Sequence, residues 1–203
     1  MIFTILMTFV KMLNKNYWES RYNESNTGWD IGYASTPLTA YFDQLSNKNL
    51  EILIPGAGFG HEALYLADKG FKNITVLDIS SIPLSNIKDS LPYPALVTCI
   101  EEDFFQHTQN YDLIIEQTFF CALDPRLRSS YASHIHKLLK PGGKLTGVLF
   151  NFPPNEQGPP YGGSYSEYQN LFSEYFSIKT LEPCYNSIKP RQGNELFFIF
   201  ESK

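Results

Sequence analysis

Short apolar runs alternate with helical patterns through most of this chain, and that alternation limits the possible folds more than any other feature. The apolar runs predict buried strands over residues 50–55, 73–78, 95–100, 111–116 and 144–152. The segments between them predict helices over residues 61–69, 83–90 and 125–139. Strands that a helix connects lie parallel in a sheet, so the sequence predicts an α/β protein.

The C-terminal part of the chain departs from this alternation. A Pro- and Gly-rich loop over 151–163 precedes a helix over 164–175, and two strands follow over 177–183 and 195–201. The connection between these two strands is too short for a crossover helix, which predicts antiparallel pairing. We therefore expect one Rossmann-like domain over residues 17–203. Its sheet should be mostly parallel and seven-stranded, with an antiparallel C-terminal strand and helices on both faces.

Residues 1–16 form an apolar N-terminal extension. Its apolar run, Met1 to Val10, is too short to cross a bilayer and lacks the basic start and cleavage site of a signal peptide. Two alternatives remain: a short helix that docks on the domain, or a translation start placed too early, with Met7 and Met12 as the other candidates. We expect no membrane partner.

Charge and cysteine content argue against several classes of function. The net charge is −5 and no Lys- or Arg-rich run is present, so we expect no nucleic-acid partner. The three cysteines are widely spaced and the four histidines follow no ligand spacing, which argues against a metal site. The cysteine pattern also favours a reducing, cytoplasmic location. We expect a monomer or a weak dimer.

Three glycines, Gly56, Gly58 and Gly60, lie between the first predicted strand and the helix that follows it. Glycines there allow a tight turn and a close approach of the backbone to a nucleotide-containing ligand. Asp78 ends the next predicted strand, where a carboxylate can bind both ribose hydroxyls. A nicotinamide-binding fingerprint would need a further glycine at position 61, which is histidine here, so that cofactor is disfavoured.

An acidic and aromatic segment, Glu102-Asp103-Phe104, follows the third predicted strand. A carboxylate there can accept a hydrogen bond from an adenine amino group, and an aromatic ring can pack on the base. Taken alone, the segment also fits a solvated acidic loop. Together with the glycine loop it favours an adenine-containing cofactor.

Several strings in the chain match those of a known family, in the same order. They are Trp29-Asp30-Ile31-Gly32, Ile54-Pro55-Gly56-Ala57-Gly58-Phe59-Gly60-His61-Glu62, Leu77-Asp78-Ile79-Ser80, Thr118-Phe119-Phe120-Cys121-Ala122-Leu123, Leu138-Leu139-Lys140-Pro141-Gly142-Gly143 and Gly158-Pro159-Pro160-Tyr161. Over residues 17–201 the chain resembles the thiopurine S-methyltransferase family, most closely its halide and thiol methyltransferase branch. The resemblance implies a class I methyltransferase fold. It also implies S-adenosylmethionine as cofactor, S-adenosylhomocysteine as product and a small-molecule methyl acceptor.

The resemblance implies roles for single residues as well. The cofactor-binding set consists of Trp18, Tyr22, Trp29, Gly56, Gly58, Gly60, Asp78, Ile79, Asp103, Phe104 and Glu116. The aromatic members suit a sulfonium, because aromatic faces attract cations. Glu116 and Gln117 would lie beside the transferred methyl group as the catalytic pair. The acceptor-binding set consists of Gln117, Phe119, Arg128 and Tyr161, with Arg126 and Arg191 as further sources of positive charge.

One position departs from the family pattern and leaves the acceptor open. The residue after the carboxylate is usually Tyr in the halide and thiol branch and Arg in the thiopurine enzymes, but it is Gln117 here. The first hypothesis is methyl transfer to a small soft nucleophile: a thiol, hydrosulfide, thiocyanate or halide. This chemistry needs no strong general base. The alternatives are transfer to an oxygen or nitrogen of another metabolite, a silent module that binds S-adenosylmethionine, and a nicotinamide-dependent reductase.

Overall fold

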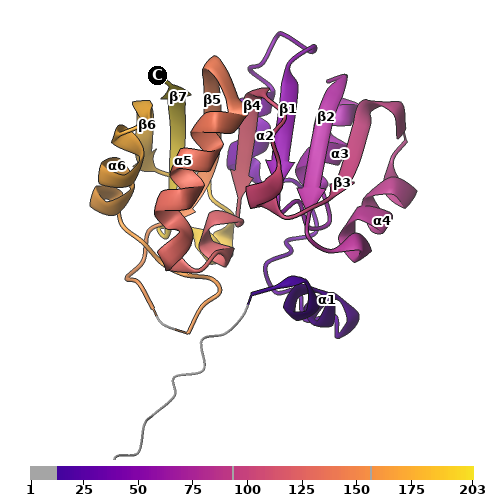
Figure 1. Ribbon diagram of the computed structural model, residues 1–203, viewed down its shortest axis with the longest axis horizontal. Coiled ribbons are helices and arrows are strands. Elements are labelled where there is room, and N and C mark those ends of the chain that lie inside the picture. The colour runs from indigo at the N-terminus through magenta and orange to yellow at the C-terminus, as the bar shows by residue number, and fades with distance from the viewer. Residues whose placement is uncertain (1–12, 93, 156) are drawn as a thin grey trace, which may run out of the picture.

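The computed structural model describes residues 13–92, 94–155 and 157–203. Within these residues seven strands form one sheet in the order β3-β2-β1-β4-β5-β7-β6 (Figure 1). The strands are β1 (Glu51–Pro55), β2 (Asn73–Asp78), β3 (Val97–Glu101), β4 (Tyr111–Gln117), β5 (Leu139–Phe150), β6 (Phe176–Pro183) and β7 (Glu195–Ser202). Residues 1–12 of the predicted extension lie outside the described part of the chain.

Helices cover both faces of the sheet. They are α2 (Thr36–Phe42), α3 (His61–Asp68), α4 (Ser81–Ser90), α5 (Arg128–Leu138) and α6 (Tyr165–Ser173). Helix α1 (Lys15–Asn23) lies beyond one edge of the sheet instead (Figure 1). Figure 1 shows α5 in front of the sheet and α2 and α3 behind it. One face buries a largely aliphatic cluster that includes α2, α3 and α4, and the other buries an aromatic-rich cluster that includes α5 and α6. None of the helices in the described ranges has the length and apolar character needed to span a bilayer.

The strand directions confirm the predicted fold class. Strands β1 to β5 are parallel, and β7 is antiparallel to both of its neighbours, β5 and β6. The sheet grows in opposite directions from its centre, because β2 and β3 lie on one side of β1 while β4 and β5 lie on the other. Open α/β sheets bind ligands outside the carboxyl ends of the strands at such a switch point.

Some elements differ from the sequence-based expectation. Helix α2 was not predicted, because its seven residues are too few to show a clear helical period. Helix α5 begins at Arg128 rather than Pro125, since Pro125–Leu127 form a 3₁₀ turn that Asp124 caps. The predicted helix ends at 139 and the predicted strand begins at 144, but β5 already begins at Leu139, which pairs with Tyr111. The residues between are an irregularity in the pairing of β4 and β5.

Strands β4 and β5 approach each other closely at Gly147. A Cβ atom at this position would lie 2.0 Å from the backbone oxygen of Glu116, so only glycine fits without a shift of the sheet. This close approach lies one residue before the end of β4 and the start of the loop that lines the cavity.

Candidate active site

The carboxyl ends of the parallel strands open onto a cavity of about 770 Å³. The loops after β1, β2 and β3 form one side of its wall, and the loops after β4 and β5 form the other. Residues 13–29, which we call the N-terminal cover, contribute a third side through α1 and the segment that follows it. A cavity of this size can hold a nucleoside-containing cofactor and a small second ligand together.

The glycine loop between β1 and α3 lies against this cavity. Gly56, Gly58 and Gly60 have φ angles of 58°, 53° and 70°, a region that favours glycine. A Cβ atom at Gly56 would lie 2.2 Å from the ring of Phe119, so glycine allows the loop after β4 to close against the glycine loop. Gly56 lines the cavity, whereas Gly58 and Gly60 do not. A Cβ atom at Gly58 would face Tyr22 and Trp29, and one at Gly60 would clash with Ile87.

Asp78 ends β2 and lines the cavity beside Ile79. Its side chain is buried and accepts hydrogen bonds from the backbone N–H groups of Ser80 (2.9 Å) and Gly58 (3.2 Å). Burial raises the pKa of Asp78 to about 6, although these hydrogen bonds act in the opposite direction. The carboxylate retains further lone pairs, so it can accept two more hydrogen bonds, as a ribose diol requires.

Glu102, Asp103 and Phe104 follow β3 and line the same side of the cavity. The ring of Phe104 packs edge-on against Phe119, with centroids 5.1 Å apart. Glu102 is oriented by the buried His107, whose Nδ1 lies 2.8 Å from the Glu102 Oε2 atom. The structure therefore brings two carboxylates and an aromatic edge to the place where the sequence predicts the adenine contacts.

Aromatic residues of the N-terminal cover face the glycine loop. Trp18 and Tyr22 lie one turn apart on α1, and both meet Trp29 edge-on, with ring centroids 5.5 and 5.7 Å apart. The residue after the cover, Asp30, anchors it, because its Oδ1 atom lies 2.8 Å from the Nε2 atom of His61 at the start of α3. The three aromatic residues that the sequence assigns to cofactor binding thus line one cavity with Asp78.

Glu116 occupies a different position from the one expected of a catalytic residue. It is 1% exposed and does not line the large cavity. One carboxylate oxygen accepts hydrogen bonds from the N–H groups of Phe119 (2.8 Å) and Phe120 (2.9 Å), and the other accepts from the Tyr131 hydroxyl (2.6 Å). Burial raises the pKa of Glu116 to about 7. These bonds support Thr118, whose φ of 59° is strained for a β-branched residue, so Glu116 shapes the loop after β4.

Gln117, Tyr161 and Arg128 also lie outside the lining of the large cavity. The Oε1 atom of Gln117 is buried and has no hydrogen-bond partner within the described residues. Tyr161 is largely buried, and its N–H group donates to the backbone oxygen of Cys121 (2.7 Å). Arg128 pairs with Glu167 and donates to a carbonyl oxygen of the Pro- and Gly-rich loop (2.8 Å). Tyr161 and Arg128 therefore hold this loop in place.

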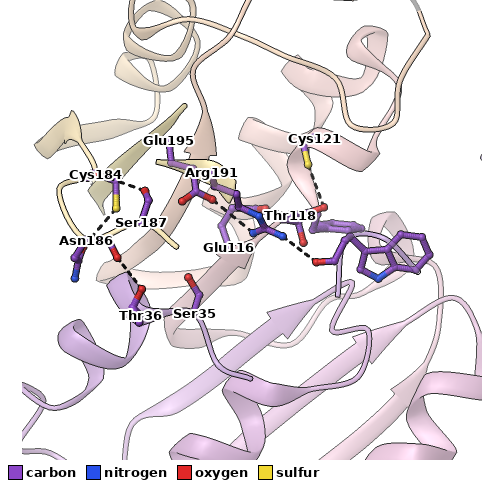
Figure 2. A network of polar contacts seen from close by, with 12 residues as sticks. Ser35, Thr36, Glu116, Thr118, Cys121, Cys184, Asn186, Ser187, Arg191 and Glu195 are labelled. Carbon is purple, nitrogen blue, oxygen red and sulfur yellow. Dashed lines mark hydrogen bonds and ion pairs between the residues drawn. The ribbon is translucent and has the colours of Figure 1, made fainter. Parts of the chain in front are cut away.

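The side of the cavity next to β4 and β5 has apolar walls and a largely buried cation. Phe119 and Phe150 line it, and the guanidinium of Arg191 lies 5.6 Å from the Phe150 ring centroid. Arg191 donates to the backbone oxygen of Trp29 (2.8 Å). It also pairs with the buried Glu195 (3.5 Å; Figure 2). Sequence reasoning named Arg191 only as one of three candidate cations. No pattern could have selected it, because its place in the site depends on how the β6–β7 connection folds back.

A family model described as thiopurine S-methyltransferase matches residues 13–201 of the chain. The chain belongs to this family. A probable thiol methyltransferase 2 from Arabidopsis thaliana is 32% identical over 197 residues, which cover 92% of this chain and 86% of that protein. A thiocyanate methyltransferase 1 from Brassica oleracea is 32% identical over 185 residues, which cover 88% and 81%. The predicted family is confirmed, and the chain is an S-adenosylmethionine-dependent methyltransferase.

Solved structures of other methyltransferases share the fold of this family member. The 1,6-didemethyltoxoflavin-N1-methyltransferase of Burkholderia thailandensis, solved with S-adenosylhomocysteine, gives a TM-score of 0.76 at 17% identity and covers 93% of this chain and 87% of its own. The magnesium protoporphyrin IX methyltransferase of Synechocystis PCC 6803, solved with S-adenosylmethionine, gives 0.73 at 15% identity and covers 96% and 99%. At these identities the likeness concerns the fold alone.

The residues around the cavity suit S-adenosylmethionine. Asp78 offers the acceptors that a ribose diol needs, and the aromatic rings of the N-terminal cover can attract a sulfonium cation. Across the described ranges, no group of three or more His, Cys, Asp or Glu side chains is placed to hold a metal ion.

The raised pKa of Asp78 predicts a pH-dependent affinity for S-adenosylhomocysteine. Ribose hydroxyls donate hydrogen bonds, so they bind the ionised carboxylate better than the protonated acid. Because this pKa is about 6 in the ligand-free protein, the affinity should fall as the pH drops below about 6. The fall should reach about tenfold per pH unit. Calorimetric titrations of the wild type and Asp78→Asn test this, and an equal slope in the variant would assign the effect to another group.

Proposed function

We propose that the chain transfers the methyl group of S-adenosylmethionine to a small soft nucleophile: a thiol, hydrosulfide, thiocyanate or halide. The observation that carries this proposal is the set of apolar walls around the guanidinium of Arg191. None of the described lining residues is His or Lys, and the carboxylate of Asp124 is taken up by Arg126 (2.6 Å). The other lining carboxylates, Asp78, Glu102 and Asp103, lie on the cofactor side of the cavity. The acceptor side therefore offers charge and desolvation to an anion, but no general base to a neutral hydroxyl or amine.

The residues of the chain act by position and by exclusion of water. When bound, S-adenosylmethionine would supply an activated methyl group for the nucleophile and would leave as the neutral thioether S-adenosylhomocysteine. Asp78 and the glycine loop orient the nucleoside, while Phe119 and Phe150 direct the acceptor toward the methyl group. Alignment of two reactants in this way can lower a barrier by about 7 kcal/mol or more. Trp18 and Trp29 keep water out of the site.

Two observations support this proposal over the alternative with an oxygen or nitrogen acceptor. The plant relatives described above are named thiol and thiocyanate methyltransferases. The motive for the alternative was Gln117, whose side chain lies outside the lining of the large cavity. A reducing location such as the cytoplasm also suits the chain, because Cys99, Cys121 and Cys184 are all free thiols.

The first test is a parallel assay with purified protein and S-adenosylmethionine. Iodide, thiocyanate, hydrosulfide and thiophenol are supplied separately, and S-adenosylhomocysteine is quantified against a reaction without acceptor. We expect acceptor-dependent product, with the ranking of acceptors reporting the preference of the apolar walls. Product with hydroxyl or amine acceptors alone would contradict the proposal and favour the alternative.

Arg191 should control the affinity for anionic acceptors. Arg191→Met removes the buried charge, so we expect the KM for thiocyanate to rise about tenfold or more. Arg191→Lys keeps a charge and should retain more of the affinity. Arg126→Met is the matched control, since it removes an exposed lining guanidinium that Asp124 already neutralises. The affinity for S-adenosylhomocysteine, measured in parallel, reports whether loss of the Trp29 contact has displaced the cover. An unchanged KM in Arg191→Met would exclude the role.

A further inference from the structure

We infer that Arg21 binds the carboxylate of the methionine portion of S-adenosylmethionine. Arg21 lies on α1 and lines the cavity together with Trp18, Tyr22 and Trp29. The inference concerns the cofactor alone, so it does not depend on which acceptor the protein uses.

The guanidinium of Arg21 is held in place by aromatic rings. Its central carbon lies 5.9 Å from the ring centroid of Tyr17 and 5.9 Å from that of Trp29. The Nε–H group is buried and has no hydrogen-bond partner within the described part of the chain. A buried donor without an acceptor is costly, and a ligand in the cavity can supply the acceptor.

Charge balance around the cavity singles out the same residue. The cations among the described lining residues are Arg21, Arg126 and Arg191. Arg126 forms a forked pair with Asp124 (2.9 and 2.6 Å), and Arg191 pairs with Glu195 (3.5 Å). Arg21 has no ion pair within residues 13–203, positions 93 and 156 apart. It therefore contributes a lining charge that no protein carboxylate compensates.

The position of Arg21 indicates which anion it takes. The guanidinium lies over the ring of Trp29, and Trp29 lies next to Gly58 of the glycine loop. A Cβ atom at Gly58 would be 3.8 Å from the Nε1 atom of Trp29. The N–H group of Gly58 in turn donates to Asp78. Arg21 thus lies on the glycine-loop side of the ribose-binding carboxylate, where the amino-acid end of the cofactor extends. On the other side of β2, the loop after β3 carries Glu102, whose own carboxylate would repel the carboxylate of the cofactor.

The chemistry of the side chain fits this assignment. A guanidinium presents two parallel N–H groups that match the two oxygens of a carboxylate, whereas it repels the ammonium on the same carbon of methionine. An anionic acceptor has a separate cation, Arg191, which lies beside Phe150 and whose guanidinium contacts the backbone of Trp29 rather than its ring. Each anion of the reaction is therefore matched by its own arginine.

The test compares two ligands that differ only in the carboxylate: S-adenosylhomocysteine and S-adenosyl-3-thiopropylamine, its decarboxylated form. Both are titrated calorimetrically into the full chain. We expect Arg21→Met to raise the Kd for S-adenosylhomocysteine about 10- to 100-fold and the Kd for the decarboxylated ligand less than about twofold. Arg21→Lys, which keeps the charge without the planar fork, should lie between Arg21→Met and the wild type. Arg126→Met serves as the matched control and should leave both affinities unchanged.

The competing outcomes are distinguishable. Equal weakening of both ligands by Arg21→Met would overturn the inference, because it would assign Arg21 to the packing of Tyr17 and Trp29. Unchanged binding of S-adenosylhomocysteine with a raised KM for thiocyanate would also overturn it and assign Arg21 to the acceptor. Since both titrations proceed without turnover, failure of every acceptor in the assay above would not affect this result.

Discussion

Asp78→Asn is expected to raise the Kd for S-adenosylhomocysteine about a hundredfold or more. Hydrogen bonds to an ionised acceptor contribute about 1.5 to 3 kcal/mol each, and a ribose diol makes two of them. The amide of the variant carries no charge, and its NH₂ group cannot accept from a ribose hydroxyl. It would also face the N–H group of Gly58 or Ser80, both of which donate to Asp78 in the wild type.

The ligand-free variant should remain folded, so the loss can be attributed to binding. The carboxylate of Asp78 is destabilised by burial, as its raised pKa shows, and its removal offsets part of the lost hydrogen bonding. Asp124→Asn is the matched control, because Asp124 lines the same cavity but is paired with Arg126. Isothermal titration calorimetry gives both Kd values. Comparable losses in the two variants would mean that the cavity responds to charge in general rather than to the ribose-binding carboxylate.

Glu116→Ala should lower the free energy of unfolding by about 3 kcal/mol or more. The substitution leaves the N–H groups of Phe119 and Phe120 and the hydroxyl of Tyr131 without their acceptor. Each buried donor without a partner costs about 1 to 3 kcal/mol, and relief of the buried carboxylate offsets part of the sum. Urea unfolding followed by circular dichroism measures the difference. Tyr131→Phe removes only one of the three contacts and should cost less, about 1 to 3 kcal/mol.

The pH dependence of this difference has a defined sign. Burial raises the pKa of Glu116 from about 4.5 to about 7. Because this pKa is raised, Glu116 makes its full contribution to the free energy of unfolding when the pH is below the pKa of the unfolded chain. That contribution is lost as the pH rises through the pKa of the folded protein. The difference in the free energy of unfolding between the wild type and Glu116→Ala should therefore become smaller as the pH rises from 4.5 to about 7. A variant with wild-type stability at every pH but no turnover would instead support the catalytic role that the sequence suggested.

The sequence could predict the sheet and the cofactor side of the site because both depend on the backbone. Parallel strands end at one edge, so Gly56 at the end of β1, Asp78 at the end of β2 and Asp103 after β3 are brought together by topology alone. Their roles toward the cofactor remain predictions, but their shared location follows from the pattern of apolar runs.

The acceptor side could not be predicted in the same way, because it depends on side-chain packing. Glu116 lies at the expected end of β4, yet its carboxylate turns toward Tyr131 of α5, a contact that no local pattern encodes. Arg128 was expected near the acceptor as a source of positive charge. Its pairing with Glu167 of α6 depends on how two helices pack. Arg21 and Arg191 enter the site only through tertiary contacts.

The contact between Arg191 and the backbone of Trp29 joins positions 162 residues apart, and this has a consequence for biosynthesis. Chains emerge from the ribosome with the N-terminus first, so the glycine loop and Asp78 are available long before Arg191. Strand β6 is synthesised before β7, yet in the described sheet β7 is the strand that joins it to β5. A nascent chain that already holds every residue assigned to the cofactor therefore still lacks the wall that closes the cavity. Strand β7 joins β6 to the rest of the described sheet only after the segment that carries Arg191 has been synthesised.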